Sequence, residues 1–562
     1  MEDTWITIFM FRISSMSENC FLTRSKKQKG SQISMTQKNI LQNKYFLYLT
    51  EFFSGMSVMA VELGASRLMA PYFSSSQIVW TVIIGVIMIA MALGNVWGGR
   101  IADKNPSPDK LYGRLLLAAV WIALIPFVGR YLIAGISLLL AAFITKNFLV
   151  WAALFACLAV FAFPCVLLGT VTPSLVKYSV SSLDNNGKTV GELGALNTIG
   201  SIIGTFLPTF VTIPTVGTAI TFLIFSGVLA AISIIYFFSK KIKPIKCILS
   251  ILLILILGLT SSSFSFAFWE DDITLEDESI YNYLQVKETD SSVILSTNVL
   301  FGVQSILMKE SKLTGMYYDY ALAAPIMAGI PQKNSPGSIL ILGLGSGTFA
   351  KYCSEFFPGT SIEGVEIDQK IANLASEYFD LPDTVKVSVY DGRSYLAASE
   401  QKYDVIMVDA YQDITIPFQM SSVEFFTEVQ NHLTDNGVMV VNMNMKSQSE
   451  HSINDYLCDT IGSVFDNVYT VPVQGGTNCE VFAFQNPQIL SSFQKDYKNL
   501  GEPALSDMME TVAENLTRRE SGNLILTDDK APVEVLGMRV LDEIIADELD
   551  YYRELYLGEI LH

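Results

Sequence analysis

The stretch Ser338-Ile-Leu-Ile-Leu-Gly-Leu-Gly-Ser-Gly-Thr348 decides the fold of this chain. Its apolar first half runs directly into glycines at positions 343, 345 and 347, and residues 349–356 have the composition of a helix. This order predicts a buried strand, a tight turn and the start of a helix. A glycine turn lets a ligand approach the backbone, and the following helix N-terminus presents free N–H groups to it. The stretch therefore predicts a site for a nucleoside-like ligand.

A second expected strand supports this interpretation. Ile362-Glu-Gly-Val-Glu-Ile-Asp368 ends in acids, and Glu366 lies 23 residues after Gly343. That separation is close to the roughly 20 residues at which an acid meets a ribose. The alternation continues and predicts an α/β Rossmann-like fold with a mostly parallel, doubly wound sheet. We expect strands at 338–342, 361–367, 385–390, 403–409 and 437–444, helices at 348–356, 369–378, 393–399, 421–433 and 450–463, late strands near 467–473 and 479–485, and a terminal helix at 535–557.

Acidic residues stand where successive expected strands end. Ligands of doubly wound sheets bind outside the carboxyl ends of the strands. Glu366 can take ribose hydroxyls, Asp391 can accept from an adenine amino group, and Asp409 is placed to meet the reacting end of the ligand. The alternative is that each acid only caps the helix that follows it. The candidate cosubstrate-binding residues in this region are Gly343, Gly345, Ser346, Gly347, Glu366, Asp368, Asp391 and Gly392.

The acids also bear on the kind of ligand. A cationic ligand suits them better than NAD does, and S-adenosylmethionine or its decarboxylated form is a sulfonium whose attached carbons are already electrophilic. The protein then has to bind, orient and deprotonate. We expect no metal, because the seven cysteines form no CxxC pair and the three histidines are scattered.

The N-terminal half has the composition of a membrane protein. Half of the chain is apolar and only 16% is charged. Most of the expected spans reach the roughly 20 residues that a bilayer requires. They lie at about 46–70, 78–99, 111–128, 131–145, 149–176, 191–212, 217–239 and 247–267. Gly99-Arg-Ile-Ala-Asp-Lys104 resembles the first half of the cytoplasmic signature of the major facilitator superfamily.

Charge is unevenly divided between the two halves. Residues 1–270 carry a net charge of +10 and the remainder −28, which argues against nucleic acid as a partner of the acidic half. The basic tail and the loop at 100–114 are expected inside the cell. If 131–145 does not cross, the Lys240–Lys246 loop is also inside and residues 270–562 are exported. If it crosses, there are eight spans and the C-terminal half is cytoplasmic. We expect a multi-pass plasma-membrane protein with a cytoplasmic soluble half, because nucleoside cosubstrates are made in the cytoplasm.

Four segments follow from these observations. We expect a polar basic tail at 1–44, a helical bundle of seven or eight spans at 45–269, a small antiparallel sheet within 270–335, and the nucleoside-binding domain at 336–562. The start at Met1 or Met35 stays open.

Residues 275–534 resemble the spermidine synthases, the polyamine aminopropyltransferases. The whole chain resembles bacterial proteins in which a multi-span bundle is fused to such a domain. The resemblance rests on four stretches in addition to the glycine turn. These are Ser279-Ile-Tyr281-Asn282, Val303-Gln304-Ser305, Tyr317-Tyr318-Asp319 and Leu526-Thr-Asp-Asp-Lys-Ala-Pro-Val-Glu534. The resemblance implies that Asn282 contacts the cosubstrate and that Gln304, Tyr317, Tyr318, Asp319 and Tyr411 line the acceptor site.

The sequence departs from the family's pattern where the chemistry takes place. Ser346 stands where the family has an acid that holds the donor amine. After the fourth strand the family has Asp-x-x-Asp, and here Asp409-Ala-Tyr-Gln412 is followed by Asp413. We therefore expect Asp409, Gln412 and Asp413 to carry the catalytic roles.

Three functions are consistent with the sequence. The first is a membrane-bound aminopropyltransferase that uses decarboxylated S-adenosylmethionine and a polyamine, such as putrescine, or another small cationic acceptor. The second is an S-adenosylmethionine-dependent methyltransferase. The third is a non-catalytic polyamine-binding or transporting membrane protein, in which Glu62 would matter for uptake. The expected partners are the lipid bilayer and the cationic acceptor, and a homo-oligomer is possible.

Overall fold

The structure, a computed structural model, describes residues 43–179, 186–261, 264–299, 303–310, 313–410, 416–444 and 449–557. The expected polar tail lies almost wholly outside these residues. From Asn43 onward the chain forms one compact unit with a helical bundle and two sheets.

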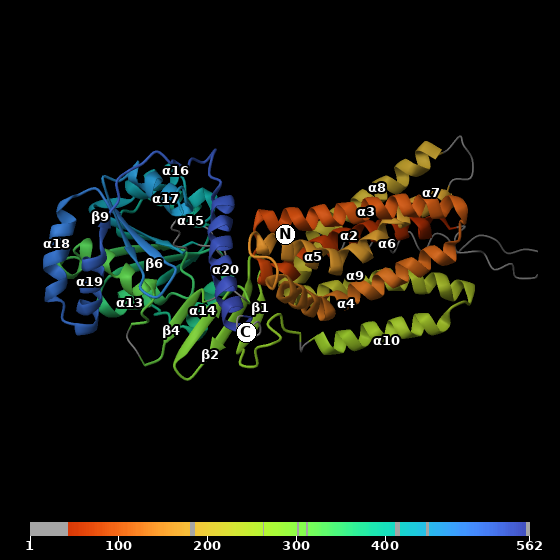
Figure 1. The fold of residues 1–562 in the computed structure, drawn as a ribbon, viewed down its shortest axis with the longest axis horizontal. Helices are drawn as coiled ribbons and strands as arrows, with labels where there is room; N and C mark the ends of the chain where they lie inside the picture. Colours follow the sequence, from red (N-terminus) through yellow and green to blue (C-terminus); the bar gives the residue numbers. More distant parts are fainter. Residues whose placement is uncertain are drawn as a thin grey trace, which may run out of the picture. The chain divides into compact units, whose positions relative to one another are not determined.

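Long apolar helices make up the first part of this unit (Figure 1). The structure has five helical stretches that are long and apolar enough to cross a membrane. The last of them, Gly187–Lys240, turns at Gly217, whose φ is +79°. The bundle consists of α2 (Lys44–Phe73), α3 (Gln77–Lys104), α4 (Pro108–Ala141), the run α5 (Phe148–Cys157), η2 (Leu158–Ala162), α6 (Phe163–Gly169) and α7 (Val171–Ser179), then α8 (Asn186–Leu207), η4 (Pro208–Thr212), α9 (Ile213–Lys240) and the shorter α10 (Pro244–Thr260).

The structure joins two of the expected spans. Residues 111–128 and most of 131–145 belong to one helix, because α4 continues without a break from Pro108 to Ala141. Arg130 lies within this helix. Its guanidinium donates to the carbonyl of Ser265 at 2.5 Å and lies over the Tyr131 ring, so the helix accommodates it.

Small residues allow the helices of the bundle to pack closely. A Cβ on Gly200 would lie 2.0 Å from the carbonyl oxygen of Phe52, and one on Gly94 would lie 2.3 Å from that of Val166. Helix α8 thus packs against α2, and α6 against α3, at near backbone contact. The fully buried acid of the first helix is Glu51, which accepts from Thr172 and Asn197. Glu62 is only partly buried.

A small antiparallel sheet precedes the main one. Its strands pair in chain order: β1 (Leu275–Glu278), β2 (Tyr283–Glu288), β3 (Ser292–Ser296) and β4 (Ser305–Met308). The sequence predicts strands at 281–288, 292–297 and 303–309, which correspond to β2, β3 and β4, whereas β1 was not predicted. The inner face of this small sheet packs Leu284, Val286 and Leu295 against Ile371 and Leu374 of α14 (Gln369–Tyr378).

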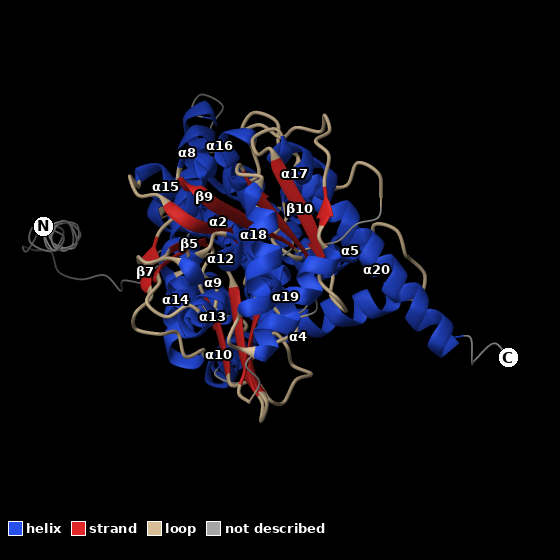
Figure 2. Ribbon diagram, turned by 90° about the vertical axis from the view of Figure 1, so that its left-hand side faces the viewer, coloured by secondary structure: helices blue, strands red, loops and turns tan. Residues whose placement is uncertain are grey.

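The main sheet has the predicted doubly wound order. Its eight strands run β12-β10-β11-β9-β8-β5-β6-β7, with helices on both faces (Figure 2). The strands are β5 (Ser338–Leu342), β6 (Ser361–Glu366), β7 (Lys386–Val389), β8 (Tyr403–Val408), β9 (Leu433–Met443), β10 (Asn467–Pro472), β11 (Cys479–Phe484) and the two-residue β12 (Thr517–Arg518). Strands β5 to β9 are parallel, whereas β10 and β11 are antiparallel to their neighbours. The strand order reverses between β5 and β8, so ligands are expected at that edge.

The helices of this half follow the strands much as the sequence predicts. They are α11 (Tyr317–Ala321), α12 (Ala323–Met327), α13 (Thr348–Phe356), α14 (Gln369–Tyr378), α15 (Gly392–Ala398), α16 (Val423–Asn431), α17 (Ile453–Gly462), α18 (Gln488–Asp496), α19 (Pro503–Asn515) and α20 (Val533–Leu557). The expected terminal helix is confirmed as α20, whereas α11, α12, α18 and α19 were not predicted.

Candidate active site

A cavity opens at the point where the strand order of the main sheet reverses. It measures about 970 Å³ including its solvent-filled mouth, which is room for a nucleoside ligand. The predicted residues that line it are Asn282, Gln304, Gly343, Gly345, Glu366, Asp391, Gly392 and Asp409. The strand-end acids and the glycine turn are thus brought together, although Gly343 and Asp409 stand 66 positions apart in the sequence.

The glycine turn after β5 forms the floor of the cavity. Gly343 has a φ of +92°, and a Cβ there would lie 2.5 Å from the carbonyl oxygen of Asp409, so only glycine fits. Gly345 donates its N–H to Glu366 Oε2 at 2.9 Å, and the N–H of Asp368 donates to Glu366 Oε1 at 3.0 Å. Two backbone donors therefore orient the Glu366 carboxylate. Burial raises the pKa of Glu366, and the two N–H groups oppose that shift.

Side chains of two different elements hold both carboxylate oxygens of Asp409. Tyr317 of α11 donates its hydroxyl to Asp409 Oδ2 at 2.6 Å, and Asn442 of β9 donates to Oδ1 at 2.9 Å. Burial raises the pKa of Asp409 to about 7, while these two hydrogen bonds lower it and the charge of Glu366 raises it. A carboxyl with a pKa near neutrality is suited to accept a proton.

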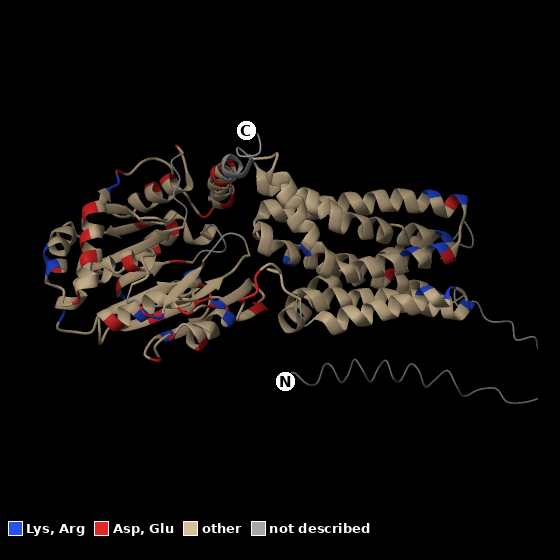
Figure 3. Cartoon of the chain, turned by 60° about the horizontal axis from the view of Figure 1, so that its bottom comes forward, with Lys and Arg blue, Asp and Glu red and all other residues tan. Residues whose placement is uncertain are grey.

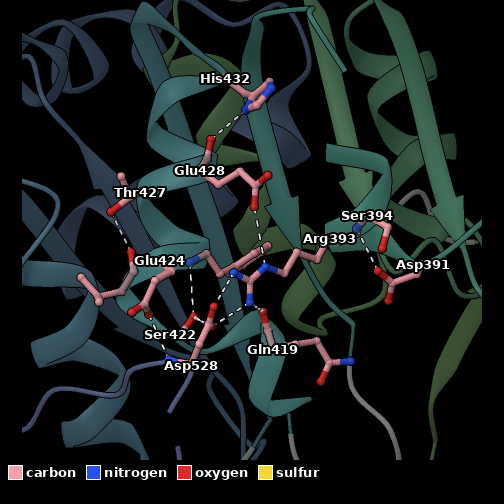
Figure 4. A network of polar contacts seen from close by, with 12 residues as sticks. Asp391, Arg393, Ser394, Gln419, Ser422, Glu424, Thr427, Glu428, His432 and Asp528 are labelled. Atoms are coloured by element: carbon pink, nitrogen blue, oxygen red, sulfur yellow. Dashed lines mark hydrogen bonds and ion pairs between the residues drawn. The ribbon is translucent and has the colours of Figure 1, made fainter. Parts of the chain in front are cut away.

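Asp391 both lines the cavity and caps α15. Its Oδ1 accepts from the N–H of Ser394 at 2.8 Å, which leaves the other oxygen for a ligand (Figure 4). The neighbouring Arg393 binds both oxygens of Asp528 at 2.7 and 2.8 Å and donates to the carbonyl of Gln419 at 2.9 Å. Gln419 belongs to the cavity wall, so this bidentate pair ties the wall to the segment around Asp528. The segment 526–534, which carries part of the family resemblance, therefore holds Gln419 of the cavity wall in place through Asp528 and Arg393.

Several candidate residues lie beside the cavity and do not line it. Asp368 caps α14 and accepts from Ser279 and Asn282. Ser346 is buried and bonds to Thr348. Gly347 is the N-cap residue of α13.

The other residues expected to bind the acceptor substrate form contacts around the cavity. Asp319 is fully buried and accepts from the N–H of Gly315 at 2.6 Å, so it shapes the loop before α11. Tyr318 stacks near Tyr317 and donates to the carbonyl of Gln304 at 3.2 Å. The candidates Tyr411, Gln412 and Asp413 lie outside the described residues.

Other lining residues were not singled out as candidates. Tyr390, immediately before Asp391, is 56% exposed and offers an aromatic face, and Ile367 and Ile371 add an apolar wall. Met420 closes the same side. Tyr390 is the last residue of the strand expected at 385–390, so the strand-end rule that located Asp391 also applies to it. In the described part of the chain, no group of His, Cys, Asp and Glu has the arrangement of a metal site.

Comparison with known proteins assigns a family to this architecture. Residues 325–479 match the family model of the spermine/spermidine synthase domain. A protein of Bifidobacterium longum named "Probable polyamine aminopropyl transferase" is 51% identical over 346 residues, which is 58% of this chain and 76% of that protein. This chain belongs to the spermidine synthase family. It is thus a transferase of the polyamine aminopropyltransferase type.

More distant members of the spermidine synthase family match the same half. The polyamine aminopropyltransferase of Vibrio vulnificus is 29% identical, with 38% of this chain and 72% of that protein covered. The crystal structure of a probable spermidine synthase from Corynebacterium glutamicum superposes with a TM-score of 0.35 at 21% identity, over 45% of this chain and 99% of that one.

Proposed function

We propose that this spermidine synthase family member transfers an aminopropyl group from decarboxylated S-adenosylmethionine to a polyamine acceptor such as putrescine. The observation that carries the proposal is the placement of Asp409. This buried acid, held by Tyr317 and Asn442, stands beside the glycine turn and Glu366, where a donor and an acceptor can meet.

The donor would occupy the cavity along residues that the structure brings together. Its ribose hydroxyls would bind Glu366. Its adenine would lie against Tyr390 and donate a hydrogen bond from its amino group to Asp391. The sulfonium would lie above the glycine turn, with the aminopropyl carbon directed towards Asp409. The absence of Lys and Arg from the described cavity lining suits a cationic donor.

The reaction requires positioning and a proton acceptor. The neutral nitrogen of the acceptor attacks the aminopropyl carbon next to sulfur, a C–N bond forms, and the C–S bond breaks to leave a neutral thioether. The attacking nitrogen loses one proton, which ionised Asp409 accepts. Tyr317 and Asn442 keep both oxygens of Asp409 oriented during this step.

The identity of the donor gives the first test. Titration calorimetry should show that the decarboxylated donor binds at least ten-fold more tightly than S-adenosylmethionine, because a carboxylate would be buried close to Asp409 and Glu366. Product analysis with putrescine should then show spermidine. Tighter binding of S-adenosylmethionine together with a methylated product would contradict the proposal.

Methyl transfer is the second candidate, and Ser346 is the observation that favours it. This residue replaces the acid that the family pattern places near the donor amine, and its hydroxyl is already bonded to Thr348. The turn therefore offers no carboxylate of its own to recognise an aminopropyl group or to repel a methionine carboxylate.

We also propose that residues 270–562 lie on the side of the membrane away from the basic helix ends. The unbroken α4 leaves seven transmembrane segments in place of eight, when the break at Gly217 separates α8 from α9 and α10 is counted. Lys and Arg gather at one end of these helices (Figure 3). That end holds Lys44, Arg100, Lys104, Lys110, Arg114, Lys177, Lys188, Lys240, Lys241, Lys243 and Lys246, whereas Arg67, Arg130 and Lys146 lie towards the other.

Positive residues retain loops in the cytoplasm, so the basic end would be inside. An odd number of crossings then carries the C-terminal half outside, contrary to the placement expected from donor supply. A donor made in the cytoplasm would have to cross the membrane to reach that side, and the bundle would be the part of the chain that transports it.

Cysteine labelling in intact cells tests this placement. The six described cysteines are buried, so a single exposed cysteine can be introduced at Glu400 after Cys20 is replaced by serine. Glu400→Cys should react with a membrane-impermeant maleimide, whereas Lys110→Cys should react only after permeabilisation. The reverse pattern would place the soluble half in the cytoplasm.

A further inference from the structure

The hairpin that joins the first two helices of the bundle, residues 67–77 of α2 and α3, lies beside the candidate active site. Two further cavities adjoin this hairpin, of about 790 and 750 Å³ including their solvent-filled mouths. Each of them shares lining residues with the cavity of the candidate active site: Tyr281, Asn282 and Thr297 in the first, and Pro417 and Gln419 in the second. These two walls of the site therefore have open space behind them, so that few contacts hold them in place.

The first wall is the tight turn between β1 and β2. Ser279 Oγ accepts from the N–H groups of Tyr281 at 3.0 Å and Asn282 at 2.8 Å. The side chain of Asn282 also donates to Asp368 at 3.1 Å. Asp368, at the start of α14, thus holds this turn from the side of the main sheet.

The bundle holds the same turn from the side of the second cavity. Arg67 of α2 donates from its guanidinium to the carbonyl of Ile280, and both residues line that cavity. Four residues further along α2, the carbonyl of Pro71 accepts from the N–H of Val299 at 3.0 Å. The hairpin is thereby bonded to both loops of the small sheet that carry cavity residues.

The opposite end of the hairpin contacts the second wall. The N–H of Gln77, the first residue of α3, donates to Glu534 Oε2 at 3.0 Å. Glu534 belongs to the segment 526–534, which holds Gln419 through Asp528. One hairpin of the bundle is therefore bonded to the supports of two walls of the candidate active site.

The backbone between these contacts has an unusual conformation. Ser74, which ends α2, has a φ of 71° and a ψ of 162°. Residues other than glycine rarely adopt this conformation, and it persists only where the surrounding contacts impose it. The bonds at Arg67, Pro71 and Gln77 provide such contacts.

We propose that the hairpin is part of the donor site and that Arg67 is a positioning residue of that site. By binding the Ile280 carbonyl, Arg67 keeps Tyr281 and Asn282 against the nucleoside part of the donor. The bundle would then be required for donor binding as well as for anchoring the chain. This inference rests on the proposed occupation of the cavity by a sulfonium donor, and not on the group that is transferred.

Nucleoside binding to the full-length protein in lipid nanodiscs tests the role of Arg67. The probe is 5′-methylthioadenosine, the neutral thioether that the proposed reaction leaves. In titration calorimetry, Arg67→Met should raise its dissociation constant roughly 5- to 50-fold, because methionine keeps an apolar stem and loses the charged N–H donor. Arg67→Lys, which retains an N–H donor on a long side chain, should stay within about three-fold of the unaltered protein.

The kinetic effect separates positioning from a general loss of structure. Arg67 contacts no reacting atom, so at saturating donor Arg67→Met should keep the kcat and the KM for putrescine while the KM for the donor rises. The melting temperature of the variant should stay close to that of the unaltered protein, because methionine suits an apolar helix.

Arg130→Met is the matched control. Arg130 is also an arginine of the bundle that donates to a backbone carbonyl, that of Ser265, but it does not line the donor cavity. Its replacement should leave the dissociation constant of 5′-methylthioadenosine within about two-fold.

A second variant tests the other end of the hairpin. Gln77→Pro removes the N–H that bonds to Glu534, and proline is tolerated at the first residue of a helix. Ser76, with a φ of −64° and a ψ of 152°, already has a conformation that suits a following proline. This variant should also weaken binding of 5′-methylthioadenosine, by about three- to ten-fold.

The outcomes distinguish this inference from the proposed function. If the unaltered protein binds 5′-methylthioadenosine and forms no spermidine, aminopropyl transfer fails and the role of Arg67 can still be measured. If Arg67→Met keeps the dissociation constant, or if Arg130→Met raises it equally, the role of Arg67 is overturned. A protein that does not bind 5′-methylthioadenosine at all would overturn both.

Discussion

Replacing Asp409 by asparagine is expected to lower kcat by about 10²- to 10⁴-fold, the usual contribution of a positioned general base. Asparagine has nearly the same shape and can still accept from Tyr317, but it cannot take the proton of the attacking nitrogen. The affinity for the donor should change little, because donor contacts are expected at Glu366, Asp391 and the glycine turn. Steady-state kinetics with spermidine detection, together with donor titration, would measure both quantities.

The protonation of Asp409 gives this prediction its pH dependence. The base must be ionised, so kcat/KM should rise as the pH increases through about 7, the raised pKa of Asp409. The effect on stability has the opposite sign. Between the ordinary pKa of an aspartate and about 7, the folded state binds more protons than the unfolded state, so the free energy of unfolding falls as the pH rises. A pH–rate profile without an inflection near 7 in the unaltered protein would contradict the assignment.

Glu366→Gln is expected to weaken donor binding by roughly 10- to 100-fold, as the loss of charged hydrogen bonds to two hydroxyls implies. The amide has only one acceptor oxygen, so its NH₂ group would face one of the two backbone N–H groups that now bond to Glu366. Both the ribose contacts and the geometry of the glycine turn would suffer. Titration calorimetry with the decarboxylated donor measures the effect directly.

The same strand provides a control for Glu366. Glu363→Gln changes a buried carboxylate that points to the other face of β6, where it meets Lys386 and Tyr403. It should leave the donor dissociation constant within about two-fold. Equal losses in the two variants would show that the sheet, and not the ribose contact, is responsible.

The parallel core could be predicted because its strands are buried on both faces and its helices are amphipathic. Residues 338–342 and 369–378 match β5 and α14 to the residue. The edge strand β1 could not be found in this way, since three of its four residues are acidic. Tertiary partners stabilise it: Glu278 accepts from Thr218, and Asp277 binds Lys370 at 2.7 Å. Neither partner is near in the sequence.

The candidate site was predicted where it depends on strand ends. Glu366, Asp391 and Asp409 line one cavity, as the rule for doubly wound sheets implies. The rule does not give the direction of a side chain once the strand has ended, and Asp368 turns away to cap α14.

Long-range contacts set the other limit on the sequence prediction. The bond between Tyr317 and Asp409 joins residues 92 positions apart, and it was not predicted. The family resemblance assigned Tyr317 only to the acceptor site.

The contact between Gly343 and Asp409 has a consequence for how such an enzyme can diversify. The turn that would carry the donor touches the backbone of the residue that would carry the base, with no side chain between them. Side-chain substitutions therefore cannot change the distance between the two halves of the reaction. Side chains that line the rest of the cavity, such as Tyr390 and Met420, have no such constraint. Mutation can alter ligand preference there while the contact between Gly343 and Asp409 keeps its dimensions.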